Sequence, residues 1–126
     1  MKIIGINYLH SDASCSLIID NKLVAAVEEE RFVRKKHYSA FPYKSLNFCL
    51  NFSNLKISDI DFFCFNFNKL YNLEKKINFL VKYPELLKIS KSRLEKEEFT
   101  KKILDELNIP RKKIKFVPHH KSHMAS

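Results

Sequence analysis

The alternation of apolar and polar residues predicts three consecutive β-strands at the start of the chain. Their sequences are KIIGINY, ASCSLIID and the beginning of KLVAAVEEERF, which cover Lys2–Tyr8, Ala13–Asp20 and Lys22–Phe32. Asp20 and Asn21 tolerate the positive φ that a two-residue hairpin requires, so the second and third strands should pair antiparallel. We expect the three strands to open a sheet.

The period of the pattern then changes from two residues to between three and four. Leu46, Cys49 and Leu50 recur at helical spacing, and a proline at position 42 suits a first helical turn. A helix is therefore expected from about Pro42 to Phe52.

A strand rich in phenylalanine is expected at residues 58–67, SDIDFFCFNF. Phe63, Phe65 and Phe67 would lie on one face, and Phe62 and Cys64 on the other. A strand that is apolar on both sides is typical of a central strand with helices covering each face.

The remaining chain is predicted to hold two helices, a short strand and the start of another helix. Residues 72–108 are charged and helical in pattern, with a break at Pro84, a second helix near Ser92 and an end at Pro110. KKIKFVP, residues 112–118, is expected as a fifth strand, and HHKSHMAS, residues 119–126, as the opening of a further helix. The inward residues of the second helix would be Leu94, Phe99, Ile103 and Leu107.

The predicted order β-β-β-α-β-α-β-α indicates an α/β fold. Three antiparallel strands followed by right-handed crossovers describe the ribonuclease-H-like half of the actin-like ATPase superfold. A chain of 126 residues is long enough for one domain.

Composition removes several function classes. Gly5 is the only glycine, so a Walker loop and a dinucleotide fingerprint are both excluded. The three cysteines are widely spaced in apolar contexts, which favours buried side chains over a disulfide framework or a zinc knuckle. No run of 18 apolar residues exists and the N-terminus is a poor secretion signal, so we expect a cytoplasmic protein without membrane contact.

The formal charge of +9 raises the alternative of a basic module that binds nucleic acid or another polyanion. Many of the lysines, however, are scattered among glutamates in residues 74–102, a pattern typical of solvated helix faces. The charge therefore does not favour a nucleic-acid partner. The polyanion-binding alternative would be supported by a cluster, on one face, of Arg34, Lys35, Arg111 and Lys112.

Three histidines follow the predicted fifth strand. His119 and His123 are four residues apart, so on a helix their imidazoles emerge from one face and can bind one metal ion. The strand that ends at Pro118 would deliver them to the carboxyl edge of the sheet, where open α/β sheets bind ligands. Two ligands are too few for a site and the spacing is common, so a stand-alone metal-binding protein and a structural role both stay open.

A second group of candidate residues follows the predicted third strand in EEERFVRKKHYSAFP, residues 28–42. Its mixed charges could bind a phosphate or a carbamoyl group through charge-assisted hydrogen bonds. The alternative is a solvated connection between strand and helix. The candidates are Glu29, Glu30, Arg31, Arg34, Lys35 and His37.

The turn between the first two predicted strands reads HSDAS, residues 10–14. In the actin-like superfold this turn faces the nucleotide, so Asp12 and Ser14 could order a metal or a phosphate. Otherwise these residues are good turn formers.

Together these stretches resemble the N-terminal signature of the O-carbamoyltransferases, which include nodulation-factor and antibiotic carbamoyltransferases. The family's N-terminus runs as Gly-Ile, His-Asp-Ala-Ser, an apolar strand ending in Asp-Gly, then EERF, RKKH and FP. Its later HHLSHAAS is matched by HHKSHMAS at residues 119–126. Several separated motifs agree in order and spacing, although residues 68–110 match only as a charged helical region.

The resemblance implies an actin-like domain similar to the tRNA threonylcarbamoyl-adenosine transferase, followed by a YrdC-like domain. The YrdC-like domain would make carbamoyl-adenylate from carbamoyl phosphate and ATP, and the actin-like domain would pass the carbamoyl group to a substrate hydroxyl. His119, His123 and a later Asp would hold a divalent metal, with iron expected. His10 and Asp12 would be catalytic, and the residues for substrate or phosphate would be Ser14, Glu30, Arg31, Arg34, Lys35 and His37.

The sequence departs from the family pattern in two ways that bear on whether the chain is active alone. The family's His before Asp falls in register on Ser11, with His10 one place earlier. Family members run to several hundred residues, so residues 1–126 are expected to form a single truncated N-terminal subdomain that is inactive alone. A half-domain completed by a separately encoded YrdC-like chain is the alternative.

Overall fold

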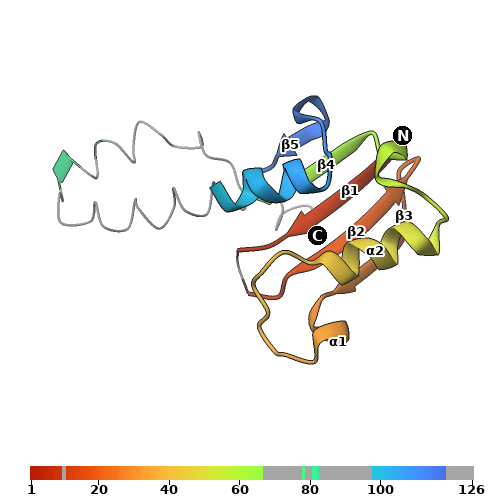
Figure 1. Cartoon of the computed structure of the whole chain (residues 1–126), viewed down its shortest axis with the longest axis horizontal. Helices are drawn as coiled ribbons and strands as arrows, with labels where there is room; N and C mark the ends of the chain where they lie inside the picture. Colours follow the sequence, from red (N-terminus) through yellow and green to blue (C-terminus); the bar gives the residue numbers. More distant parts are fainter. Residues whose placement is uncertain (10, 67–77, 79–80, 83–97, 119–126) are drawn as a thin grey trace.

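Five strands form one mixed sheet in the computed structural model, which describes residues 1–9, 11–66, 78, 81–82 and 98–118 (Figure 1). The order across the sheet is β3-β2-β1-β4-β5. β1, β2 and β3 pair antiparallel, whereas β4 and β5 run parallel to β1. The opening strands and the last strand therefore share one sheet, and the predicted α/β class is confirmed. The strands are β1 Lys2–Asn7, β2 Ser14–Ile19, β3 Lys22–Glu28, β4 Phe62–Phe65 and β5 Ile114–Phe116.

The predicted hairpin between β2 and β3 is confirmed. Asp20 and Asn21 have φ angles of 48° and 64°, and Ile19 pairs with Lys22 on either side of them. Positive φ at both central residues is the geometry of a type I′ turn, whose twist matches that of the flanking strands.

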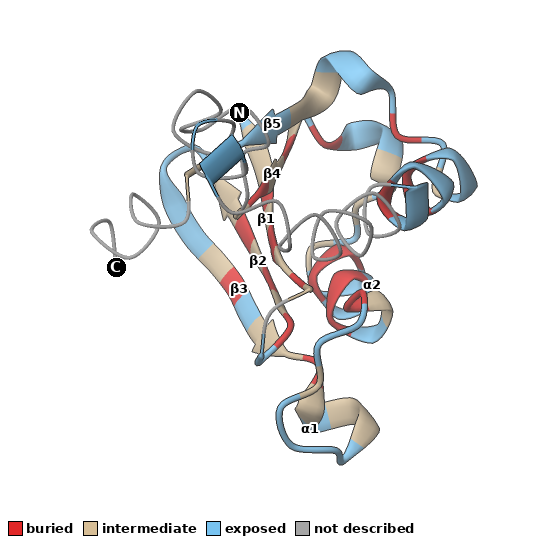
Figure 2. Cartoon of the chain, turned by 90° about the vertical axis from the view of Figure 1, so that its left-hand side faces the viewer, coloured by how far each residue is buried: buried red, intermediate tan, exposed pale blue. Residues whose placement is uncertain are grey.

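The helical elements that cover the sheet lie on one face of it (Figure 2). α2, Tyr43–Phe52, packs on β2 and β3, and a helical segment at residues 98–106 lies on the same side. α1, Glu30–Val33, is a single turn directly after β3. Two short 3-10 turns, η1 at Ile57–Asp59 and η3 at Arg111–Lys113, precede β4 and β5.

We call the face under α2 and residues 98–106 the closed face, because the core lies there. Every second residue of the central strands points into it, and Leu46, Cys49 and Leu50 of α2 are buried against them as predicted. The ring of Tyr8 contacts Phe41 and Phe65 edge-on, and its hydroxyl hydrogen-bonds Thr100. The strand residues buried on this face are Ile4, Ile6, Cys15, Leu17, Ala25, Phe63 and Phe65.

The opposite face, which we call the open face, corrects one prediction. Phe63 and Phe65 are buried as expected, but Phe62 and Cys64 are only half-buried. Among the described residues no helix covers their side of the sheet. The strand order explains this, because right-handed crossovers from β3 to β4 and from β4 to β5 step in the same direction and place their helices on one side.

Other predictions need smaller corrections. The beginning of the stretch 22–32 forms the third strand as predicted; the strand ends at Glu28 and α1 begins at Glu30. In the segment 98–106 and the turn after it, Ile103 and Leu107 pack on the core as predicted, but Phe99 is 42% exposed and Leu104 is buried instead. Phe67, Leu94 and the predicted helix at 119–126 lie outside the described residues.

The cysteines are free, as predicted. Cys15 and Cys49 are buried as predicted, whereas Cys64, also predicted to be buried, is half-buried on the open face. Within the described part of the chain, no helix is long and apolar enough to cross a membrane.

Candidate functional site

The residues that the sequence predicts as functional lie near one end of the strands. Asn7 pairs with Ser14, and Ser14 pairs with Glu28. On the other side of β1, Ile6 pairs with Phe65, which pairs with Phe116. The carboxyl ends of β1, β3, β4 and β5 therefore meet at the same edge, which is where open α/β sheets bind ligands.

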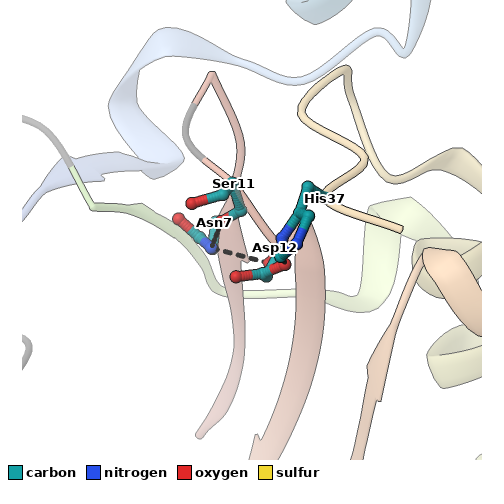
Figure 3. Close-up of polar contacts among 4 residues, drawn as sticks. All are labelled: Asn7, Ser11, Asp12 and His37. Carbon is teal, nitrogen blue, oxygen red and sulfur yellow. Dashed lines mark hydrogen bonds and ion pairs between the residues drawn. The ribbon is translucent and has the colours of Figure 1, made fainter. Parts of the chain in front are cut away.

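A carboxylate–imidazole pair lies at this edge (Figure 3). Nδ1 of His37 is 3.2 Å from Oδ1 of Asp12. A carboxylate can only accept, so the pairing places a ring proton on Nδ1; in the neutral form of the ring, Nε2 then carries the lone pair. The His37 side chain is 77% exposed, so this nitrogen is accessible to a substrate. Asp12 was predicted as catalytic and His37 only as a phosphate ligand.

Backbone contacts hold the two partners together. The amide of Leu9 donates to the Ser39 carbonyl and that of Ala13 donates to the Tyr38 carbonyl, each at 2.8 Å. These bonds join the β1–β2 turn to the loop that carries His37. Asp12 and His37 also both adopt left-handed backbone, with φ of 66° and 55°. Such non-glycine conformations often occur at functional sites.

Two asparagines support the turn from the ends of parallel strands. Nδ2 of Asn7, the last residue of β1, donates to the carbonyl of Asp12 at 2.9 Å and to that of Ser11 at 3.5 Å (Figure 3). Asn66, directly after β4, donates to Oδ1 of Asn7. Oδ1 of Asn66 is buried and accepts no hydrogen bond from the described residues. The sequence analysis missed both residues, although an asparagine directly after an apolar strand is a usable signal.

Glu29 has a structural role. Its side chain is buried and accepts hydrogen bonds from the amides of Lys44 and Ser45, at 3.1 and 2.7 Å, and from the Ser45 hydroxyl at 2.7 Å. These donors form the first turn of α2, whose positive end favours a carboxylate. Glu29 therefore fixes α2 to the end of β3.

The other charged residues of the stretch form a solvated connection. Arg31 is 3.9 Å from Glu28 in an exposed i,i+3 pair, and Arg34 and Lys35 are exposed. Glu30 begins α1 and is half-buried. Of the predicted phosphate ligands, Ser14 and Arg31 line a groove on the open face, and only His37 pairs with another candidate.

The four basic residues whose clustering would support a polyanion partner are all described, and they do not cluster. Arg34 and Lys35 follow α1 at the edge where β3 ends, whereas Arg111 and Lys112 lie in η3 just before β5 begins. Because β3 and β5 both run parallel to β1, one pair lies at the carboxyl ends of these strands and the other pair at their amino ends.

Three predicted histidines, His10, His119 and His123, lie outside the described residues. The described chain ends at Pro118, directly beyond the carboxyl end of β5. The part of the chain that is described contains no group of three or more His, Cys, Asp or Glu residues able to hold a metal ion.

Comparison with known proteins identifies the family. The family model described as carbamoyltransferase N-terminus matches residues 2–126. An uncharacterized protein of Synechocystis is 32% identical over 137 residues, with 98% of this chain and 22% of that protein covered. Nodulation protein NolNO of Sinorhizobium fredii is 32% identical over 126 residues, with 94% of this chain and 17% of that protein covered.

A shorter match is an uncharacterized 19.2 kDa protein of Rhizobium etli, 38% identical over 55 residues, with 44% of this chain and 32% of that protein covered. The chain thus spans less than a quarter of the length of the first two relatives, at 22% and 17%. The strands, the paired Asp12 and His37 and the matched motifs all fall within the family model. The chain belongs to the carbamoyltransferase N-terminus family.

Proposed function

We propose that this chain forms the N-terminal part of a cytoplasmic carbamoyltransferase with a ribonuclease-H-like, actin-like domain. The enzyme passes the carbamoyl group of carbamoyl-adenylate, made from carbamoyl phosphate and ATP, to a hydroxyl group of a small-molecule substrate. The strand order β3-β2-β1-β4-β5, with an antiparallel opening and two parallel strands, supports the fold. The family match supports the reaction.

The observation that carries the proposal is the convergence at the carboxyl edge. Asp12 and His37 are paired there. β5 ends at the same edge, and His119 follows Pro118 directly in the sequence. A base at this edge and two potential metal ligands that follow β5 in the sequence therefore support the proposal.

The proposed transfer joins the acceptor oxygen to the carbamoyl carbon and breaks the bond from that carbon to the phosphate oxygen of AMP. The acceptor loses its proton and AMP leaves with the electron pair of the broken bond. Nε2 of His37 takes the proton, while Asp12 fixes the tautomer and stabilises the charged ring. Ser14 and Arg31, which line the adjoining groove, are placed to bind polar groups of the substrate.

A divalent metal, iron in our proposal, fits the donor types that follow β5. His119 and His123 supply imidazole nitrogens, which suit iron and zinc, and a further ligand has to come from elsewhere. When bound, the ion would act as a Lewis acid on the phosphate oxygens of the adenylate.

Adenylate formation is assigned to sequence that the relatives have beyond the matched part, carried on the same chain or by a separately encoded YrdC-like partner. The 126 residues alone should then show no carbamoyl transfer. A hybrid tests both statements: this chain replaces the matched segment of the Sinorhizobium fredii relative, and transfer of label from carbamoyl phosphate to a panel of alcohols and sugars is measured with ATP.

We expect the hybrid to transfer label and the isolated chain to transfer none. His37→Ala in the hybrid should lower kcat by about 10²- to 10⁴-fold with a smaller change in KM, because it removes a general base. Arg111→Ala, at the opposite edge, is the matched control and should leave kcat unchanged. Turnover by the isolated chain, or full activity of the His37→Ala hybrid, would contradict the proposal.

A further inference from the structure

The outer side of α2 is unusual for a surface helix. Ser45, Leu46, Cys49 and Leu50 are buried on the side that packs on the sheet. The exposed residues of the helix recur at helical spacing on the opposite side, which charged residues ordinarily line. Here that side holds two phenylalanines and a single charge. Its exposed residues are Lys44, Asn47, Phe48, Asn51 and Phe52.

The two phenylalanines belong to a continuous row of three rings. The ring centres of Phe48 and Phe52 are 5.9 Å apart, and the ring of Phe32 in α1 lies 5.8 Å from that of Phe48. Phe48 is 38% exposed and Phe52 is 64% exposed. Isolated apolar side chains are common on protein surfaces, whereas a contiguous apolar group rimmed by polar residues indicates an interaction site. We call Phe32, Phe48 and Phe52 the aromatic row.

Basic residues flank the aromatic row. Lys44 lies one turn before Phe48 on the same side of α2, and three more cations follow α1 within four residues of Phe32. Every exposed charged side chain of residues 30–53 is basic, and the one acidic residue of that range, Glu30, is half-buried. The surface therefore favours a partner of negative charge. The basic rim, as we call it, consists of Arg34, Lys35, Lys36 and Lys44.

The shape of this surface fits another helix. Lys44, Phe48 and Phe52 are spaced by four residues, so they form one ridge along α2. Such a ridge packs into the groove between two ridges of a second helix, and aromatic residues are enriched in the centres of protein interfaces. A second copy of this chain is disfavoured as the partner, because it would bring two basic rims together.

The rings are also placed for contact with a protein rather than with nucleic-acid bases. Proteins that bind single strands present ring faces on which successive bases stack. In the aromatic row, neighbouring rings are tilted by 45° and 32° and contact one another at 5.8 and 5.9 Å, so no base can enter between them. Together they form one apolar ridge instead of separate stacking platforms.

We propose that the aromatic row and the basic rim bind an acidic amphipathic helix of a partner protein. Apolar side chains of that helix pack against Phe48 and Phe52, and carboxylates on its flanks pair with the basic rim. The surface contains neither Asp12 nor His37. The inference therefore goes beyond the proposed carbamoyl transfer and does not rest on it.

The probe is a synthetic amphipathic helical peptide with leucines on one side and glutamates on the rest, and its binding to the full chain is measured by fluorescence anisotropy. Phe48→Ser combined with Phe52→Ser should raise the dissociation constant about tenfold or more, because these rings form the centre of the surface. Phe116→Ser is the matched control, because Phe116 is also 38% exposed but lies in β5, at the far side of the sheet. It should leave binding unchanged.

A second pair of variants tests the charge. Lys35→Glu combined with Lys44→Glu should weaken binding of the acidic peptide about tenfold, and added salt should weaken binding to the parent chain. Lys112→Glu combined with Lys115→Glu changes the net charge by the same amount in η3 and β5, away from the surface, and should have little effect. Equal losses for the two pairs would overturn the proposal, because net charge alone would then explain the binding.

Other outcomes would also overturn it. Failure of the acidic peptide to bind, or equal binding of a peptide with lysine in place of glutamate, would exclude an acidic helix as the partner. Sedimentation that shows self-association of the parent chain, lost in the Phe48→Ser, Phe52→Ser variant, would assign the surface to a second copy. Tighter binding to phosphatidylserine-containing vesicles or to single-stranded RNA, lost in the same variant, would assign it to a membrane or to a nucleic acid.

Discussion

The two faces of the sheet are built from alternate residues of the same strands, yet they differ in kind. On the closed face Ile4, Ile6 and Phe63 are at most 3% exposed, in one core cluster with Leu46 and Leu50 of α2. On the open face Gly5, Ser16 and Cys64 present a shallow, partly polar surface. Large interlocking residues make a face that stabilises the fold by burial, whereas small residues make one that admits close approach.

The largest contrast should come from two neighbouring phenylalanines of β4. Phe63→Ala removes a fully buried ring from the closed face and should lower the free energy of unfolding by about 3–5 kcal/mol. Phe62→Ala, on the open face, should lower it by only about 1 kcal/mol, because the ring is half-buried. Urea unfolding of both variants measures the difference. Equal losses would show that the open face is as tightly packed as the closed one.

The closed face should also make stability depend on alkaline pH. Burial raises the pKa of Tyr8 to about 12, although its hydrogen bond with Thr100 acts to lower it. An unfolded tyrosine loses its proton near pH 10, so between about pH 10 and 12 the unfolded state binds fewer protons than the native state. The free energy of unfolding should therefore fall as pH rises through this window, by about 2–3 kcal/mol from this group.

Tyr8→Phe is the control for this fall, because it keeps the ring and removes the titrating hydroxyl. Its unfolding free energy, followed by urea titration at each pH, should decline less between pH 10 and 12 than that of the parent chain. Parallel curves for the two proteins would exclude Tyr8 as the source of the dependence.

The anchor of α2 should have the next largest effect. Glu29→Gln keeps the side-chain shape but removes the charge that accepts hydrogen bonds from Lys44 and Ser45. We expect a loss of about 1–3 kcal/mol in unfolding free energy. Glu30→Gln, one residue later, should change it by less than about 0.5 kcal/mol. A similar small change for both would show that the buried carboxylate does not hold α2 to the sheet.

The smallest effect is expected on the open face. Nζ of Lys115 lies 5.2 Å from the centre of the Phe62 ring. An exposed cation–π contact contributes about 0.5 kcal/mol. A double-mutant cycle of Lys115→Met with Phe62→Leu should recover a coupling energy of that size, and Lys112→Met with Phe62→Leu should give none. Coupling well above this value would mean that the open face is more desolvated than its exposure indicates.

Local pattern was sufficient to predict the elements. The period-two strands, the Asp20–Asn21 hairpin and the helical spacing of Leu46, Cys49 and Leu50 all depend on residues close in sequence. The apolar pattern on both sides of β4 predicted two covered faces, whereas Phe62 and Cys64 are only half-buried and, within the described residues, helices cover the closed face alone. A strand that is apolar on both sides has the same sequence pattern whether or not a helix covers its second face. The pattern alone therefore does not distinguish the two cases.

The candidate site depended on contacts that the sequence pattern does not contain. Asp12 and His37 are 25 residues apart, and backbone hydrogen bonds rather than a motif hold the β1–β2 turn against the loop that carries His37. Glu29 looked like one more charge in a polar stretch, and only the fold shows it beneath α2. The metal-ligand prediction for His119 and His123 stays a prediction, since both lie outside the described residues.

The left-handed backbone positions have a practical consequence. Eight described residues adopt positive φ and none of them is glycine. Each non-glycine residue in this conformation costs about 1–2 kcal/mol relative to glycine, less for Asn and Asp. Arg34, which is exposed, is therefore a natural site for a stabilising glycine substitution, which should raise the melting temperature. Leu9 is not, because its side chain packs against the core. Asp12 and His37 are not, because the strain there maintains a contact between side chains that glycine cannot supply.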